Sequence, residues 1–397
     1  MLNIFYTYSL IWIAILVLYS FGWSDLCTQL DTKLLIFLII SIILSLIIGK
    51  IVSNKFKFIK LEQNPHKTKG TTLFLIIFYI LDFIYAKKIP ILHVLAGNSY
   101  AAVNFNGIPT LHVLLSAFAI FYSTYLAYIF ICFKEKKVLI EYILTISFFL
   151  LLVQRQNIFV CIMLFFNILW ASKKNEFNRK TKNKKGKYLI LFVVFLSIAL
   201  YGFGIIGNMR YGSKWDWNDS SMICKLGKIS NKYPKVLPKE YFWSYLYLTS
   251  PLSNLNANIK NVNGNDNTTY FLMEFVPEVI RNNVFSSYEK KEVLLPVKSL
   301  NASTSFVRVY NYFGYAGMYA MSIFQLMISL VIIVITYKNQ KKYFNVVCNI
   351  LMYFLVFSFF ENTVVYSTTS LLVIYSLFCN IKIKKINKEN KVYRQNL

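Results

Sequence analysis

The stretch LLIFLIISIILSLIIGKIV, from Leu34 to Val52, decides the fold class of this chain. Apolar side chains would cover every face of a helix built from it, and Lys50 near its end is its one charged residue. A helix rises about 1.5 Å per residue, so this stretch could cross most of the roughly 30 Å hydrocarbon core of a bilayer. It therefore predicts a membrane-spanning helix.

Similar apolar stretches recur along the whole chain of 397 residues, of which 56% are hydrophobic and 15% are charged. Soluble domains carry roughly 25% charged residues, and disordered chains are poor in apolar residues, so both classes are excluded. We expect an all-α polytopic membrane protein with about ten transmembrane helices. The predicted spans are Leu2–Tyr19, Leu34–Val52, Thr71–Tyr85, Ile108–Phe133, Val138–Val153, Asn157–Ala171, Tyr188–Gly207, Phe313–Tyr337, Phe344–Phe360 and Thr363–Asn380.

Lys and Arg outnumber Asp and Glu by 43 to 17, which gives a formal net charge of +26. In a soluble protein this excess would indicate nucleic-acid binding, but here the basic residues lie between apolar stretches. With the N-terminus placed inside, the predicted inner connections and the C-terminal tail hold 26 Lys and Arg, whereas the short outer connections hold 4. This bias follows the positive-inside rule, so we expect cytoplasmic termini and no nucleic-acid partner.

The predicted spans fall into two groups separated by one long outer loop. We expect residues 1–207 to form a membrane domain of seven spans and residues 208–308 to form a large periplasmic loop with short amphipathic helices. Residues 309–380 would hold the last three spans, and residues 381–397 a basic cytoplasmic tail. A loop of this length is uncommon unless it carries function. Within it, Tyr241–Leu255 is expected to lie along the membrane interface, anchored by aromatic residues such as Trp243 and Tyr245.

Five charged residues lie at the predicted outer ends of spans, and placing a charge inside a membrane costs roughly 2.5–3.5 kcal/mol. Arg155 forms the turn in LLLVQRQNIFV, and the spans on both sides of it are short, so it is expected at or below the outer headgroups. Arg210 follows a span in GIIGNMRYG, and Arg308 precedes one in TSFVRVYNYFGYAG. Together with Asp82 and Glu361, they are expected to converge on one face of the protein.

Arginine suits a buried diphosphate because its planar guanidinium binds two oxygens at once and stays charged at low dielectric. The pattern therefore predicts a sugar-bearing phosphorylated lipid as substrate, with Arg155 and Arg210 in catalysis. Displacing a diphosphate also needs a base near the acceptor hydroxyl, and the candidates are Glu274, Glu278, Glu361, Asp82 and a histidine. Of these, Glu274 and Glu361 are assigned to catalysis, and substrate contacts are expected from Arg281, Arg308, Asp82, His112 and Tyr211.

Each of these residues also fits a structural role. A single arginine at a helix end can extend to lipid phosphates, Asp82 can pair with Lys87 or Lys88, and Glu361 can cap its turn. His93 and His112 fit positions in the core or at the interface. The 3 histidines and 6 cysteines show no metal-binding spacing, so no metal and no cofactor is expected.

The chain resembles the Wzy-type O-antigen and capsule polymerases, also called oligosaccharide repeat-unit polymerases. The resemblance rests on the ten or so spans, the large outer loop, the arginines in QRQ and GNMRYG, and the NYFGYAGMYA entry into the eighth span. It implies a glycosyltransferase in the bacterial inner membrane that joins undecaprenyl-diphosphate-linked repeat units at the outer face. The implied partners are this lipid-linked oligosaccharide, membrane lipid and a chain-length regulator. Arg155 and Arg210 are carried over as diphosphate or glycan contacts.

Two other functions remain open at this point. A flippase or transporter of lipid-linked oligosaccharides would be expected to show paired repeats and charges in mid-membrane helices, and the sequence shows neither. The resemblance implies that an O-antigen ligase would carry a histidine in the large outer loop, and none occurs between Asn208 and Arg308. The absence of the features expected of a flippase and of a ligase favours a polymerase.

Overall fold

The structure is a computed structural model that describes residues 3–66, 70–96, 105–180, 194, 197–208, 219–262, 268–284 and 292–380. Regular elements in this part of the chain are helices, apart from one isolated antiparallel bridge between Ser24 and Ile229. The predicted all-α class is therefore confirmed.

Most of the longer helices follow predicted spans. They are α1 (Ile4–Ser20), α2 (Thr32–Val52), α3 (Gly70–Ala86), α5 (Leu111–Phe133), α6 (Lys136–Leu151), α7 (Arg155–Lys180), α13 (Phe306–Asn339), α14 (Phe344–Val356) and α15 (Ser367–Phe378). One further long helix, α10 (Tyr241–Asn261), lies in the segment predicted as the large outer loop. Part of the predicted span Tyr188–Gly207 lies outside the described residues. The short helices are α4 (Pro90–Leu95), α9 (Ser221–Leu226), α11 (Thr268–Met273) and α12 (Glu278–Val284), and there are 3₁₀ turns η1 (Ser53–Lys55), η3 (Lys341–Tyr343) and η4 (Phe357–Phe359).

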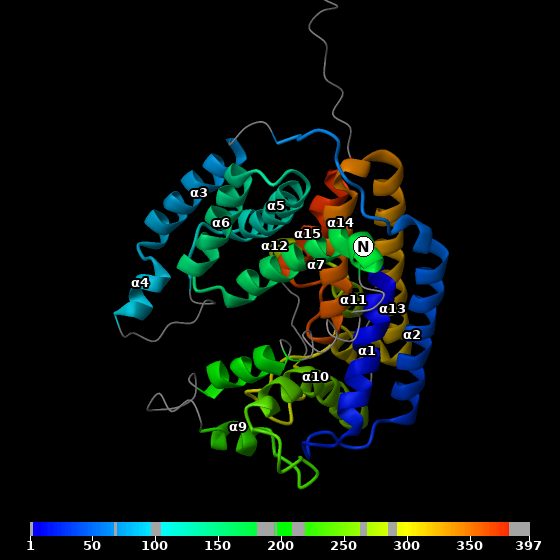
Figure 1. Ribbon diagram of the computed structural model, residues 1–397. Coiled ribbons are helices and arrows are strands. Elements are labelled where there is room, and N and C mark those ends of the chain that lie inside the picture. The colour runs from blue at the N-terminus through cyan, green and yellow to red at the C-terminus, as the bar shows by residue number, and fades with distance from the viewer. Residues whose placement is uncertain are drawn as a thin grey trace, which may run out of the picture.

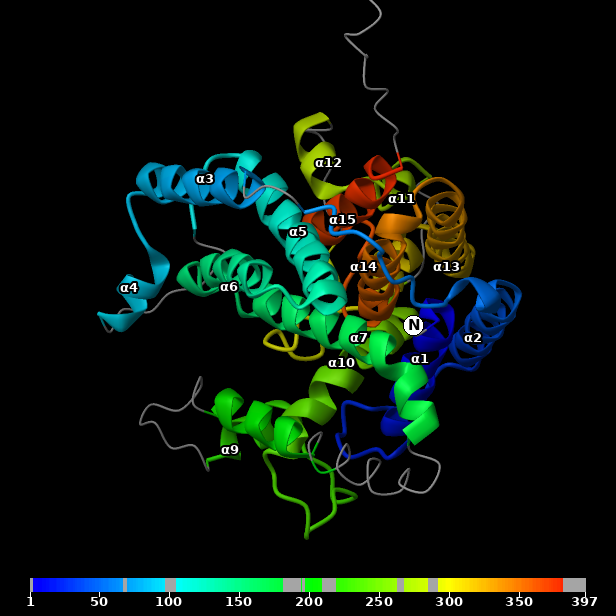
Figure 2. The same ribbon diagram turned by 45° about the horizontal axis from the view of Figure 1, so that its top comes forward.

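Helix α14 forms the centre of the bundle. Its residues from Phe344 to Leu355 are all buried, because α1, α5, α7, α13 and α15 pack around it. Figures 1 and 2 show α3, α4, α5 and α6 on one side of this central helix and α1, α2 and α13 on the other. A helix that is apolar on every side can be stable in this position, where neighbours cover all its faces.

Five helical segments of the described chain are long and apolar enough to cross a membrane. They are Thr32–Lys55, Leu111–Phe133, Arg155–Lys173, Phe306–Asn339 and Lys341–Phe359, and shorter apolar helices cover Ile4–Ser20, Gly70–Ala86, Ser197–Asn208 and Ser367–Phe378. This arrangement is consistent with a polytopic membrane protein.

The two faces of α2 show the surroundings that such a helix meets. Leu34, Phe37 and Leu38 are at most 1% exposed and pack into the bundle. The opposite face exposes an unbroken set of aliphatic side chains, namely Leu35, Ile36, Ile39, Ile40, Ile43, Leu46, Ile47 and Ile51. A soluble monomer rarely exposes so large an apolar patch, whereas lipid chains solvate it without cost. The exposed face of α2 fits contact with lipid.

Several polar side chains inside the apolar bundle are paired between helices. The Tyr8 hydroxyl of α1 lies 2.7 Å from the Ser41 hydroxyl of α2, which lies 2.8 Å from that of Ser322 on α13. Asn3 donates to the carbonyl of Gly49 at 2.7 Å, where a β-carbon would collide with the Tyr6 ring. Small and hydroxyl residues at such contacts are typical of helix pairs in membranes.

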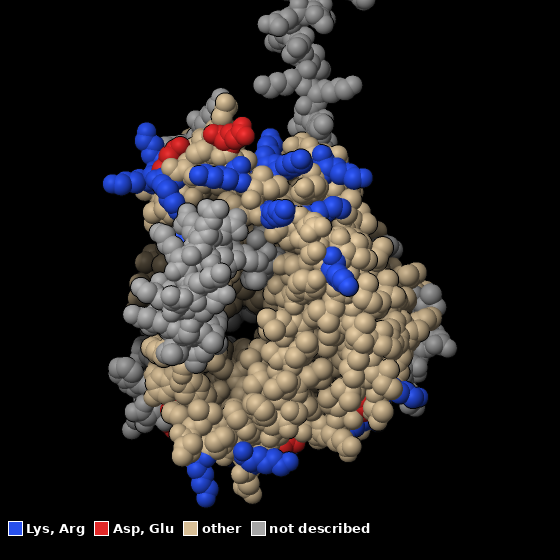
Figure 3. Space-filling view, turned by 45° about the vertical axis from the view of Figure 1, so that its right-hand side comes forward, with Lys and Arg blue, Asp and Glu red and all other residues tan. Residues whose placement is uncertain are grey.

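Positive charge gathers at one end of the molecule. Figure 3 shows Lys and Arg side chains concentrated at the top, above a wide band without charge. Exposed lysines of the predicted inner connections are Lys50, Lys57, Lys60, Lys134, Lys136, Lys137, Lys338, Lys341 and Lys342. The structure thus brings together the basic connections that the sequence assigns to the same side.

The opposite end carries α9 and α10, which pack under the bundle (Figure 1, bottom). Trp243 and Tyr245 of α10 are 4% and 3% exposed and lie in a small core with Phe242 and Ile223. The prediction that they anchor at the interface is therefore wrong. The Tyr245 hydroxyl accepts from the backbone N–H of Trp23, so these aromatic residues fasten α10 to the α1–α2 connection.

Helix α13 is bent at Phe313 and Gly314, where the backbone leaves helical geometry. Gly314 has φ 58° and ψ −150°, a region that residues with a β-carbon essentially do not enter. The bend separates a short first part, which carries Arg308, from the long apolar part. The predicted span began at Phe313, so the sequence located the apolar part but not the bend.

We expect Gly314→Ala to lower stability by about 1–3 kcal/mol, because alanine is strained in this conformation. No neighbouring atom lies within 4 Å of the added β-carbon, so the loss would be conformational and not steric. Gly202→Ala is the matched control, since that site is equally open and lies in a regular helix. Thermal unfolding of the purified protein in detergent would measure both, and equal stability of Gly314→Ala and wild type would contradict the assigned bend.

Candidate functional site

A cavity of about 270 Å³ opens where the start of α13, helix α12 and the α14–α15 turn meet. Its wall carries two acids, one arginine and several hydroxyl and amide groups. The lining residues include Glu278, Arg308, Glu361, Asn362 and Tyr366. Two of the predicted site residues, Arg308 and Glu361, therefore line one cavity although they are 53 positions apart in the sequence.

Hydrogen bonds between backbone and side chains hold the two walls of this cavity together. The backbone N–H of Ser305 donates to the carbonyl of Ser358 at 2.8 Å, and the Ser305 hydroxyl donates to the carbonyl of Glu361 at 2.8 Å. Gln325 on the long part of α13 donates to the Ser305 hydroxyl at 3.0 Å. Arg308 follows three residues later, so its position is fixed by these contacts.

A buried ion pair lies beside the cavity. Arg281 is 1% exposed, and its Nη1 atom lies 3.3 Å from Oε1 of Glu274, which is fully buried. The other guanidinium nitrogen lies 3.7 Å from Glu278, and Asn362 donates to Oε2 of Glu274 at 3.0 Å. Arg281 thus contacts carboxylates here, and it positions Glu278 on the cavity wall.

Arg308 and Glu361 differ from that pair because neither forms an ion pair with a described residue. Arg308 is half-buried and forms no ion pair with a described residue. The Oε1 atom of Glu361 is buried and has no hydrogen-bond partner within the described part of the chain. Burial raises the pKa of Glu361 to about 8 from an ordinary 4.5, while the nearby Gln156 amide lowers it. This carboxyl can therefore exchange a proton near neutral pH.

A second, smaller cavity of about 80 Å³ adjoins the first and shares Asn301, Ala302 and Phe360 with it. Its other walls include the rings of Trp243 and Tyr247 from α10. The Tyr247 ring is stacked on that of Phe360 with centroids 6.0 Å apart. An aromatic surface therefore leads from α10 to the charged cavity.

Asp82 and His112 meet in a separate cluster, 30 positions apart in the sequence. Asp82, in the last turns of α3, is fully buried and accepts from the backbone N–H of Ile108 at 2.7 Å. Its other oxygen lies 2.6 Å from Nδ1 of His112, at the start of α5. The alternative pairing with Lys87 or Lys88 is not formed; Asp82 pairs with the imidazole.

The α6–α7 turn lies between this cluster and the cavity. Gln154 contacts His112 with its amide nitrogen 3.5 Å from Nε2, and Gln156 acts on Glu361. Arg155 lies between these two residues and is exposed. The structure thus brings six predicted site residues into two clusters linked by this turn: Asp82, His112, Glu274, Arg281, Arg308 and Glu361. Two further ones, Arg210 and Tyr211, lie outside the described residues.

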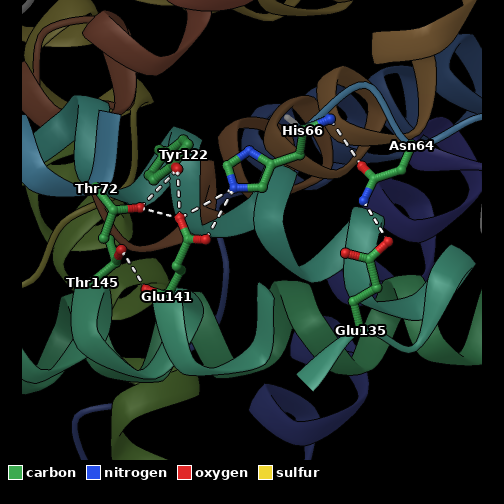
Figure 4. Close-up of polar contacts among 7 residues, drawn as sticks. All are labelled: Asn64, His66, Thr72, Tyr122, Glu135, Glu141 and Thr145. Atoms are coloured by element: carbon green, nitrogen blue, oxygen red, sulfur yellow. Dashed lines mark hydrogen bonds and ion pairs between the residues drawn. The ribbon is translucent and has the colours of Figure 1, made fainter. Parts of the chain in front are cut away.

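Sequence analysis missed a third polar cluster, near the basic end of the bundle (Figure 4). Glu141 of α6 is 5% exposed and accepts hydrogen bonds from the hydroxyls of Thr72 on α3 and Tyr122 on α5. His66 lies 3.1 Å from the same carboxylate. The signal was present in the sequence, because Glu141 is a charged residue inside the predicted span Val138–Val153.

The described residues contain no group of three or more His, Cys, Asp or Glu side chains that could hold a metal ion. No family model, no curated protein and no solved structure matches this chain. A proposal about function therefore rests on the chemistry of these clusters.

Removing one partner of the Arg281–Glu274 pair should destabilise the protein strongly, because it leaves a buried charge without compensation. We expect Glu274→Ala to cost about 3 kcal/mol, near the lower end for such pairs, since Glu278 remains close to Arg281. The double variant Glu274→Leu/Arg281→Met should recover most of this loss. Thermal unfolding in detergent measures both, with the exposed Glu292→Ala as control; a double variant no more stable than Glu274→Ala would contradict this account.

Proposed function

We propose that this protein is a membrane glycosyltransferase that polymerises a surface polysaccharide. Its substrates would be oligosaccharide repeat units linked to undecaprenyl diphosphate, as the resemblance to Wzy-type polymerases implies. The observation that carries the proposal is the cavity at the bundle end opposite the basic connections, whose wall combines Arg308, which forms no ion pair with a described residue, with the protonatable Glu361.

The proposal includes a topology of about ten spans in the bacterial inner membrane. Both termini and the basic connections would face the cytoplasm, and the end with α9 and α10 would face outward. The clustering of exposed lysines at the other end supports this orientation. The cavity would then lie at the outer surface, where lipid-linked repeat units present their sugars.

Arg308 is the residue suited to the diphosphate of the donor unit. Arg308 lines the cavity and forms no ion pair with a described residue, and two parallel hydrogen bonds from its guanidinium to phosphate oxygens would stabilise the charge that develops on the leaving group. Arg155 and Arg210 are proposed to extend this anion site from the α6–α7 turn and the large loop. Arg281 would act by positioning, because its own charge is matched by Glu274.

Glu361 is proposed as the base. Its carboxylate would take the proton of the acceptor hydroxyl while that oxygen bonds to the anomeric carbon and the bond from this carbon to the diphosphate breaks. Among the candidate acids, Glu274 is engaged by Arg281 and Asn362, and Asp82 is held by His112 and Ile108. The aromatic wall of the adjoining cavity would hold sugar rings beside this site.

Deleting the gene in its own host tests the function directly. We expect loss of the polysaccharide ladder on a gel, with single repeat units left on the lipid anchor, and restoration by the wild-type gene.

Arg308→Ala should reduce polymer at least about 100-fold and Arg308→Lys should not fully restore it, because an ammonium lacks the bidentate geometry. Lys298→Ala, which removes an exposed charge nearby, is the control and should retain the ladder.

Two results of the same experiment would contradict the proposal. An unchanged ladder in the deletion strain would exclude a polymerase. Complete absence of repeat units from the surface, with lipid-linked units retained inside, would indicate a flippase. Protein levels in the membrane must match wild type for each variant.

The pH dependence of polymer formation tests the role of Glu361. Its raised pKa keeps the carboxyl protonated in acid, so the basic form appears as pH rises through about 8. We expect activity of the purified enzyme to rise over the same range and Glu361→Gln to abolish it. Activity that instead falls through this range, or a fully active Glu361→Gln variant, would show that Glu361 is not the base.

A further inference from the structure

The cluster of Asp82, His112 and Gln154 has a geometry that fixes which atoms can meet a ligand. Because the Asp82 carboxylate lies 2.6 Å from Nδ1 of His112, that nitrogen carries a proton and donates it to the carboxylate. In the neutral imidazole the other nitrogen, Nε2, is then a hydrogen-bond acceptor. The His112 side chain is 14% exposed, so it is not sealed within the bundle.

Gln154 supplies the complementary donor. Its carbonyl oxygen accepts from the amide of Asn157 at 2.8 Å, which turns its NH₂ group toward His112. The separation of 3.5 Å between this nitrogen and Nε2 is long for a hydrogen bond. Both groups therefore retain most of their capacity to bond to a third partner between or beside them.

Backbone strain flanks this contact on both sides. Thr110, two residues before His112, has φ 62°, and Val153, directly before Gln154, has φ 59°. Residues branched at the β-carbon rarely adopt positive φ, and each such position costs of the order of 1–3 kcal/mol. The fold thus holds two unfavourable conformations that bring the imidazole and the amide together.

The chemistry of the cluster suits a sugar better than a phosphate. Asp82, His112 and Gln154 provide one acceptor and one donor without a free cation, which matches a hydroxyl group that both donates and accepts. The Phe105 ring, 5.0 Å from the imidazole, adds an apolar surface. The cavity around Arg308 differs because its wall carries a cation that forms no ion pair with a described residue.

We infer that Asp82, His112 and Gln154 form a subsite that binds a sugar of the lipid-linked oligosaccharide through its hydroxyl groups. This inference rests on the proposed function, in which the Arg308 cavity holds the diphosphate. The α6–α7 turn connects the two places, since Gln156 lies beside Glu361 and two residues of chain span at most about 7 Å. Nε2 of His112 accepts from the hydroxyl, and Asp82 is a positioning residue that holds the imidazole in this state.

Binding of two lipids to the purified full-length protein in nanodiscs would test the subsite. One probe is undecaprenyl diphosphate, and the other is the lipid-linked repeat unit extracted from the deletion strain. We expect His112→Ala and Gln154→Ala to weaken binding of the repeat unit about tenfold, the effect of one lost hydrogen bond, and to leave undecaprenyl diphosphate within about twofold of wild type. His93→Ala, which removes an exposed imidazole on α4, should change neither affinity.

The outcomes separate the subsite from the proposed function. Wild-type affinity for the repeat unit in both variants, or equal weakening of both lipids, would overturn the subsite. A wild-type protein that binds undecaprenyl diphosphate with no gain from the attached glycan would also overturn it and leave the diphosphate site intact. Asp82→Asn gives a second check: it should weaken repeat-unit binding alone, because an amide can no longer hold the proton on Nδ1.

Discussion

A charged side chain inside an apolar helix bundle must find a partner, and the polar interior of this protein is organised by that constraint. Isolated charges at such depth cost several kcal/mol, and three buried acids are each joined to a donor from elsewhere in the chain. Asp82 is paired with His112, Glu141 with His66, and Glu274 with Arg281. Each pair fixes the relative position of elements that the apolar packing alone would leave free to slide. Arg308 and Glu361, which form no ion pair with a described residue, line the same cavity.

The cavity exists because the two chain segments around it cannot continue as regular helix. Gly314 bends α13, so the short part with Arg308 turns away from the apolar span. The α14–α15 turn is held by Ser305 and Gln325 on one side and by α12 on the other, where the N–H of Glu278 donates to the carbonyl of Val365. Backbone groups released from helix geometry are thus satisfied across the site, as an apolar environment requires. The same hydrogen bonds give the side chains fixed positions.

The helices were predictable from the sequence because apolar length is a local signal, and the stretches from Leu34 and Ile108 match α2 and α5 closely. The pairings between segments that are distant in the sequence could not be predicted in this way. His112 has no acid near it in sequence, and its partner comes from the end of another helix. Trp243 and Tyr245 were assigned to the interface because aromatic residues often lie there, but the tertiary fold of the loop buries them. Glu141 was missed although it lies inside the predicted span Val138–Val153, because the candidates were taken from charges at the outer ends of spans. Arg308 and Glu361 were placed among the candidates by local context, since charge at a span end is costly.

The sequence left several acids as candidates for the base. The contacts of Glu274, Asp82 and Glu361 distinguish these three carboxylates. A base must accept a proton, so it needs a free lone pair facing the place where the acceptor hydroxyl would lie. Both oxygens of Glu274 are engaged, one by a guanidinium and the other by an amide, and protonation would cost that ion pair. Asp82 is engaged in the same way by an imidazole and a backbone N–H. Glu361 has a buried oxygen without a partner in the described chain and a raised pKa, and the residue lines the cavity. The acid that is worst stabilised as an ion is therefore the one best suited to take up a proton.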